Sequence, residues 1–105
     1  MKLDATLLSG ASALDAAVVR DLKGVPLIYV THTVEWSAGV SAGAVSIEAA
    51  PSADYAGTWS VLAVVVTSAG SSVDTVVLPG SYYAIRHRIS TAVIGGTVTT
   101  KVLGV

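Results

Sequence analysis

The residues that could do acid–base or metal chemistry in this 105-residue chain are two histidines and seven carboxylates. His32 alternates with valines and His87 alternates with isoleucines. A histidine on an apolar strand face is more often a hydrogen-bonded core residue than a metal ligand or a base, and Glu35 would point to the face opposite His32. If the two histidines face each other across a sheet pair, the structure should be sensitive to pH at about 6.

No pattern in the sequence is typical of an enzyme. The chain contains no phosphate-binding loop, no dinucleotide fingerprint and no calcium loop. The absence of cysteine removes thiolate metal sites and disulfides. Carboxylates such as Glu48, Asp54 and Asp74 are not set apart as a catalytic pair. We therefore expect a protein that is not an enzyme, with no catalytic residue, no cofactor and no metal site.

Arg86 and Arg88 are the polar side chains best suited to bind a partner, because alternate residues of a strand share one face. Two guanidiniums about 7 Å apart along a strand can hold carboxylates of a partner through paired hydrogen bonds. The alternative is a solvated outer face with an intramolecular partner such as Glu48. The sequence leaves these two interpretations open.

Three aromatic residues, Tyr55, Trp59 and Tyr82, could form a platform on which sugar rings stack, as in carbohydrate-binding modules. Trp59 follows a turn-rich stretch and enters an apolar segment. Aromatic side chains of a β-sandwich more often belong to its core, where they bury a large apolar area. A glycan-binding module is therefore an alternative function, and a partly buried Trp59 is the simpler interpretation.

The elements that must position these residues are β-strands, because apolar and polar residues alternate through most of the chain from residue 27 onward. Strands are expected over 27–36, 44–50, 59–67, 73–78, 82–91 and 97–105. Gly95 and Gly96 are expected to make a hairpin turn before the last of these. The pattern predicts an all-β fold, a single jelly-roll-like β-sandwich of about seven or eight antiparallel strands.

The first 23 residues fit more than one structure. Residues 1–12 are expected to form an amino-terminal arm or a short strand, and residues 13–105 the sandwich domain. Within 12–23, a capping-box pair and apolar residues at helical spacing favour a helix. The same segment also fits a strand near 17–22, with a single helical turn as a further alternative.

The composition indicates that neighbouring subunits cover part of the surface. Six basic and seven acidic residues make up 12% of the chain, 52% is hydrophobic, and the formal net charge is −1. A folded monomer of this size exposes roughly 5,500 Å², or about 400 Å² for each charge. A strand over 61–66 would be apolar on both faces and would need cover on both sides. The alternative is a monomer whose surface is rich in Ser and Thr.

Two classes of partner are not expected. A nearly neutral chain is poorly suited to bind nucleic acid by neutralising phosphates. The longest apolar run, 61–66, is far shorter than the roughly 20 residues that a membrane-spanning helix needs. Asp4 interrupts the only segment that could resemble a signal peptide. Neither nucleic acid nor a membrane is therefore an expected partner.

Two stretches resemble small virion proteins of tailed bacteriophages. Residues 43–49 (GAVSIEA), followed after a turn by residues 58–62 (TWSVL), are similar to a G-x-V-x-x-E-x … T-W-x-x-L stretch of these proteins. Residues 83–89 (YAIRHRI), followed by residues 95–99 (GGTVT), are similar to the ending of the same proteins. The resemblance covers about residues 27–105.

The resemblance implies a small β-sandwich or jelly roll that decorates a phage head as a cement protein. The implied partners are the major capsid protein and further copies of the chain, first of all in trimers, on the capsid surface of a virion that assembles in the host cytoplasm. A tail or neck component of the virion is the alternative. The resemblance favours a strand within 12–23, and an apolar arm with Leu3, Leu7 and Leu8 could instead reach a neighbouring subunit.

Overall fold

The computed structural model describes residues 3–22, 25, 27–67 and 72–105, which contain eight β-strands. These strands are β1 (Leu3–Thr6), β2 (Ala17–Asp21), β3 (Tyr29–Trp36), β4 (Ala42–Ala50), β5 (Ser60–Val66), β6 (Val73–Pro79), β7 (Ala84–Ile94) and β8 (Val98–Gly104). Nowhere in these ranges is there a helix that is long and apolar enough to cross a membrane.

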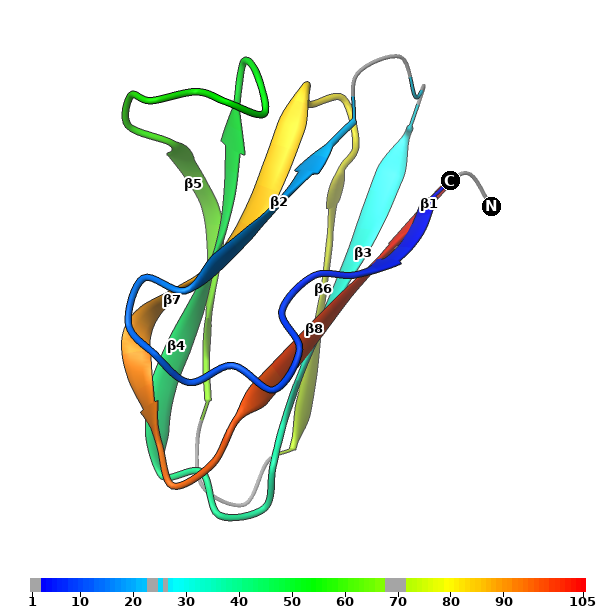
Figure 1. Ribbon diagram of the computed structural model, residues 1–105. Helices are drawn as coiled ribbons and strands as arrows, with labels where there is room; N and C mark the ends of the chain where they lie inside the picture. Colours follow the sequence, from blue (N-terminus) through cyan, green and yellow to red (C-terminus); the bar gives the residue numbers. More distant parts are fainter. Residues whose placement is uncertain (1–2, 23–24, 26, 68–71) are drawn as a thin grey trace.

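The strands form two four-stranded antiparallel sheets that pack against each other (Figure 1). One sheet has the order β1-β8-β3-β6 and the other has the order β2-β7-β4-β5. Each strand of the first half therefore pairs with one of the second half: β1 with β8, β2 with β7, β3 with β6 and β4 with β5. This long double ribbon, rolled into a sandwich, is a jelly roll. The expected all-β jelly-roll-like sandwich is confirmed.

Alternating residues of the strands build the core between the sheets, as the period of two predicts. In β3 every second residue from Val30 to Trp36 is buried. In β7 the alternating residues Ile85, His87 and Ile89 are buried as well. Burying one such aliphatic side chain contributes about 1.5–3 kcal/mol relative to leaving it exposed. The larger core cluster contains Leu8, Val34, Trp36, Val40, Val45, Ile47, Val65, Ile89, Val93 and Val98. The burial of these two inner faces is what holds the sheets together.

The glycine pair near the end of the chain does not close a hairpin, which corrects the expectation from the sequence. β7 ends at Ile94 in one sheet and β8 begins at Val98 in the other, so that Gly95 and Gly96 carry the chain across the sandwich. Among the eight described strands, β4 and β5 are the consecutive pair that share a sheet. Short connections here cross between layers because each new strand buries its apolar face against the opposite sheet.

The segment with the helix-like pattern is a turn followed by a strand. β2 pairs with β7 over its whole length, and this pairing supplies backbone hydrogen bonds that a helix would have made internally. Of the apolar residues at helical spacing, Leu14 and Val18 are exposed and Leu22 is buried. They therefore do not form one apolar helix face. The strand alternative for 12–23 is the one observed, although residue 23 lies outside the described residues.

Residues 3–8 belong to the sandwich and do not form a free arm. β1 pairs with β8, and the side chains of Leu3, Leu7 and Leu8 are between 2% and 7% exposed. The backbone N–H groups of Leu7 and Leu8 donate to the carbonyl oxygen and the Oγ1 of Thr100, at 2.8 and 3.0 Å. The three leucines that were expected to contact a partner thus lie in the chain's own core. Their apolar surface is buried there and is not offered to a partner.

Gly95→Ala should lower the free energy of unfolding by about 2–5 kcal/mol. Gly95 has a φ of 89°, and a Cβ at this position would overlap the carbonyl oxygen of Gly39; left-handed strain costs about 1–2 kcal/mol and overpacking about 1–3 kcal/mol. Gly10 is the matched control, since its φ is 59° and a Cβ there would meet nothing within 4 Å. Urea unfolding of both variants measures the difference, and equal losses would contradict the crowding argument.

Candidate functional site

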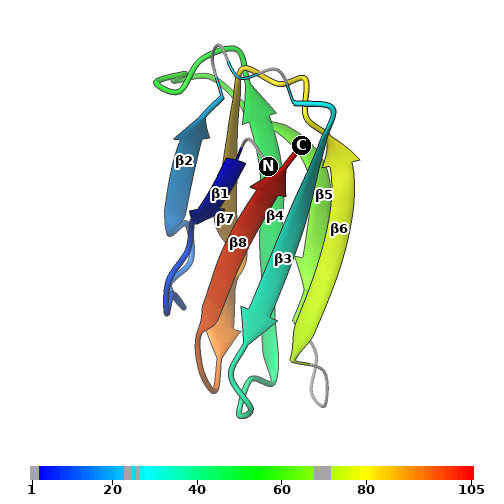
Figure 2. The same ribbon diagram turned by 90° about the vertical axis from the view of Figure 1, so that its right-hand side faces the viewer.

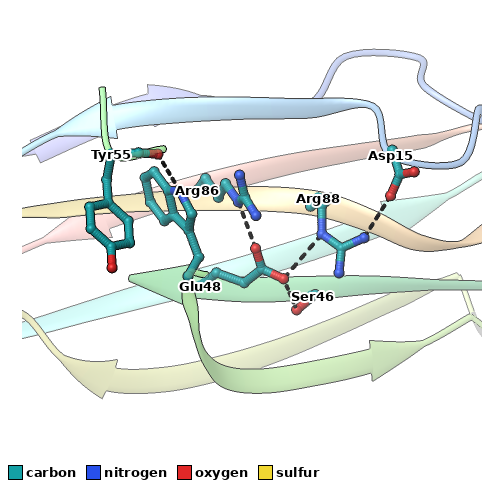
Figure 3. A network of polar contacts seen from close by, with 7 residues as sticks. Asp15, Ser46, Glu48, Tyr55, Arg86 and Arg88 are labelled. Atoms are coloured by element: carbon teal, nitrogen blue, oxygen red, sulfur yellow. Dashed lines mark hydrogen bonds and ion pairs between the residues drawn. The ribbon is translucent and has the colours of Figure 1, made fainter. Parts of the chain in front are cut away.

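A polar network centred on Glu48 lies on the outer face of the β2-β7-β4-β5 sheet (Figure 3). Arg86 Nε donates to Glu48 Oε1 at 2.6 Å, and Arg88 Nε donates to Glu48 Oε2 at 3.1 Å. Ser46 Oγ donates to Oε2 at 2.7 Å. The register of β4 against β7 places Glu48 opposite Arg86 and Ser46 opposite Arg88. The alternation of two neighbouring strands is therefore enough to bring these four side chains together.

Side chains from outside these two strands extend the network at both ends (Figure 3). At one end Arg88 Nη1 donates to Asp15 Oδ1 at 2.8 Å, from the turn before β2. At the other end the guanidinium of Arg86 lies 4.5 Å from the ring centroid of Trp59, a cation–π contact. Trp59 Nε1 donates to the carbonyl oxygen of Tyr55 at 3.1 Å. The network thus ties the entry to β5 and the turn before β2 onto the central strands.

Glu48 is held as an anion although it is 2% exposed. Burial by itself raises the pKa of its carboxyl group, but the hydrogen bonds from Ser46, Arg86 and Arg88 outweigh burial and bring the pKa below its ordinary value. Both carboxylate oxygens are occupied by these donors. A carboxylate in this state is a poor general base, so the arrangement is suited to stability and not to proton transfer.

Arg86 and Arg88 share the outer face, as the sequence predicts. Their side chains are 24% and 27% exposed, and both guanidiniums bind Glu48. Of the two interpretations left open by the sequence, the intramolecular pairing with Glu48 is present. Contact with a partner through the remaining exposed part of each arginine stays a prediction.

The three aromatic residues of the alternative glycan site do not form a platform. Trp59 is 6% exposed, and Arg86 lies over its ring. Tyr82 is half-buried and packs against the second core cluster, while Tyr55 is exposed. A stacking site needs open ring faces side by side. The structure buries Trp59, the central member, more completely than the partial burial that the simpler interpretation expected.

The two histidines meet in the core between the sheets. His32 of β3 and His87 of β7 are joined by a hydrogen bond of 2.8 Å between Nδ1 and Nε2, and His87 Nδ1 lies 2.7 Å from Thr100 Oγ1. The sequence allowed for facing histidines, but it did not identify Thr100 as their partner. Within the described part of the chain, no three His, Cys, Asp or Glu side chains gather where they could hold a metal ion.

Exposed valines lie on the edge strands of both sheets at one side of the sandwich. β5 and β6 end their respective sheets and lie side by side (Figure 2). In β5, Val65 is buried while its neighbours on the other face are exposed. The exposed valines are 52–66% accessible, and we call them the valine edge: Val61, Val64, Val66, Val73 and Val77. The three of β5 lie on the outer face of one sheet, and the two of β6 lie on the outer face of the other. One face of the apolar strand is thus covered by the chain's own core and the other is not.

Glu48→Gln should lower the free energy of unfolding by about 2 kcal/mol at neutral pH, because it removes the counter-charge of two partly buried guanidiniums. Because the pKa of Glu48 is lowered in the folded protein, this stabilisation is present above about pH 4.5 and is lost as the pH falls through the folded pKa. The difference from wild type should therefore shrink in acid. Urea unfolding against pH measures it.

Asp15→Asn is the matched control for this prediction. Asp15 binds the same Arg88 but is 71% exposed, and an exposed ion pair contributes less than about 1 kcal/mol. Asn also tolerates the φ of 67° at this position. A loss for Glu48→Gln no larger than that for Asp15→Asn would show that the network does little for stability.

Comparison with known proteins adds no relative from which a role for these residues could be transferred. No family model matches the chain, and no curated protein matches it either.

Proposed function

We propose that the chain is a non-enzymatic structural protein of a virus particle, a decoration or cement protein that binds the outer surface of a capsid. Its partners in this proposal are the major capsid protein and further copies of itself, in trimers. Each copy bridges capsid subunits and thereby stabilises the head. The protein then resides on the capsid surface of a virion that assembles in the host cytoplasm.

The observation that carries the proposal is the valine edge. Soluble monomers usually protect the edge strands of their sheets with charges, proline or a covering segment, because an open apolar edge favours association. β5 instead exposes three valines on its outer face, and β6 adds two more. In a chain with only 12% charged residues, these apolar positions on the two outer faces are best explained as ones that neighbouring subunits cover.

The magnitude of this burial favours many weak contacts over one strong contact. The five valines are a little over half exposed, so that burying each adds about 1 kcal/mol and burying the edge about 5 kcal/mol. Association costs roughly 4–15 kcal/mol in lost freedom of motion. A single contact of this kind is therefore weak, whereas a subunit that touches several neighbours gains from each of them. Additive adhesion of this kind suits a decoration protein.

The fold and the resemblance support the proposal at a coarser level. Jelly rolls are common in viral capsid proteins, although they also occur in lectin domains and cupins, and a fold does not determine a function. The stretches that resemble phage virion proteins include Glu48, Trp59, Arg86 and Arg88, the residues of the network on the outer face. Stacking by Trp59 is blocked by Arg86, so we do not carry the glycan-binding alternative further.

Replacing Val64 and Val77 by lysine in one variant should abolish self-association. The two charges would have to be desolvated in any contact that covers the valine edge. Because both positions are exposed, the free energy of unfolding should change by less than about 0.5 kcal/mol for each. Sedimentation velocity over a range of protein concentrations measures the association. Leu14→Lys is the matched control, since Leu14 is equally exposed and lies before β2.

Two results would contradict the valine edge as the contact surface. One is a wild-type protein that stays monomeric at every concentration measured. The other is a double lysine variant that associates as the wild type does, or a Leu14→Lys control that is impaired to the same degree.

The capsid itself provides the second test. Virions of the phage that encodes the chain, separated into heads and tails on a gradient, should carry the protein in the head fraction, and the double lysine variant should not be retained there. Recovery of the protein with the tails would instead identify it as a tail or neck component. Recovery in neither fraction would refute a role in the virion.

A further inference from the structure

The two buried histidines form a hydrogen-bonded bridge between the sheets. His32 belongs to the β1-β8-β3-β6 sheet and His87 to the other, and their rings are tilted by 53° with centroids 5.1 Å apart. The chain of polar contacts runs from His32 to His87 and on to Thr100 of β8, whose Oγ1 accepts the backbone N–H of Leu8. The bridge therefore leaves one sheet, reaches the other and returns.

The geometry of the bridge favours neutral imidazole rings over charged ones. Each neutral imidazole has one N–H and one acceptor nitrogen, so one proton lies between His32 Nδ1 and His87 Nε2. Full protonation of both rings would bring two N–H groups into contact at a nitrogen separation of 2.8 Å. Protonation of one ring would leave a positive charge inside the core. Both outcomes disfavour proton uptake by the folded protein.

On the described strands that pair with β3 and β7, the residues directly opposite the two histidines offer no counter-charge. Both histidines are at most 1% exposed. The cross-strand neighbours on every paired strand are apolar: Val18 of β2, Ile47 of β4, Val76 of β6 and Val102 of β8. Glu48, Arg86 and Arg88 occupy alternate positions of β4 and β7 and bind one another on the outer face. Among the described residues packed against the pair, Thr100 is the polar contributor, and it carries no charge.

Burial lowers the pKa of His32 from 6.5 to about 4, and burial together with repulsion from His32 lowers the pKa of His87 from 6.5 to about 3. Between these values and 6.5 the unfolded chain binds protons that the folded protein does not. The stability that the neutral pair contributes is therefore fully present above about pH 6.5 and is lost as the pH falls toward 4.

We propose that His32 and His87 form an acid-sensitive link, at which proton uptake separates the two sheets and opens the sandwich in mildly acidic solution. The inference rests on the geometry of the core and is independent of any role on a capsid. The valine edge takes no part in it. Between pH 7 and pH 5 acid thus acts on the contact between β3 and β7, while Glu48 keeps its charge.

The folding equilibrium constant of the wild-type protein should fall about 25-fold for each histidine between pH 7 and pH 5, and about 600-fold for the two together. Urea unfolding followed by tryptophan fluorescence measures this constant. Glu48, whose pKa is below 4.5, stays ionised throughout this window. Glu48→Gln is therefore a control that should keep the wild-type pH dependence between pH 5 and 7.

Substitution of the pair should remove this dependence in steps. His87→Gln keeps a side chain that can hydrogen-bond, and its folding constant should fall about 25-fold in place of about 600-fold over the same interval. The combination of His32→Leu and His87→Leu removes both titrating groups and replaces the bridge with apolar contact, so that its folding constant should be nearly independent of pH there. A double variant with the wild-type pH dependence would overturn the proposal.

A measurement on the unmodified protein covers the case in which the variants do not fold. The imidazole signals of His32 and His87, followed by nuclear magnetic resonance in the folded protein, should show neutral rings from pH 7 down to pH 5. Hydrogen exchange at pH 5 should then show lower protection in β3 and β7 than at pH 7. Imidazoles that titrate near 6.5 in the folded protein, or a wild-type folding constant equal at pH 7 and pH 5, would refute the link.

Discussion

The burial of two apolar sheet faces against each other is the constraint on which the rest of this structure depends. The chain has few charges and no cysteine, so that ion pairs and disulfides contribute little to its frame. Each strand of the first half instead pairs with a strand of the second half, and the rolled ribbon encloses the residues of both core clusters. Because consecutive strands mostly lie in opposite sheets, the core forms only when distant parts of the chain have met.

Polar groups that this packing buries are satisfied in two different ways. Glu48 stays charged, because two arginines and a serine bind its oxygens on the outer face. His32 and His87 stay neutral, because they meet each other and Thr100 among aliphatic side chains. The Glu48 network stabilises the protein at all but acidic pH. The histidine pair stabilises it only while both rings are neutral. One sandwich thus contains a robust polar network on its face and a sensitive one in its core.

The valine edge is the part of the apolar surface that this packing leaves uncovered. Val64 and Val66 flank Val65 in one strand, and of these three residues only Val65 reaches the core. The sequence predicts that both faces of this strand are covered, and the described chain itself covers one of them. The proposed function rests on a neighbouring subunit that would cover the other half.

The sequence by itself predicted the six strands from residue 27 onward and the faces of several residues in them, since alternation is local. The buried positions of β3 and β7 and the shared face of Arg86 and Arg88 follow from a period of two. It did not determine which strands pair. The glycines at 95 and 96 have the composition of a hairpin turn but connect two sheets, and the helix-like spacing before β2 yielded to pairing with β7. His32 meets His87 across 55 residues of chain, and such contacts depend on how two faces of the whole molecule close over each other, which no local pattern encodes.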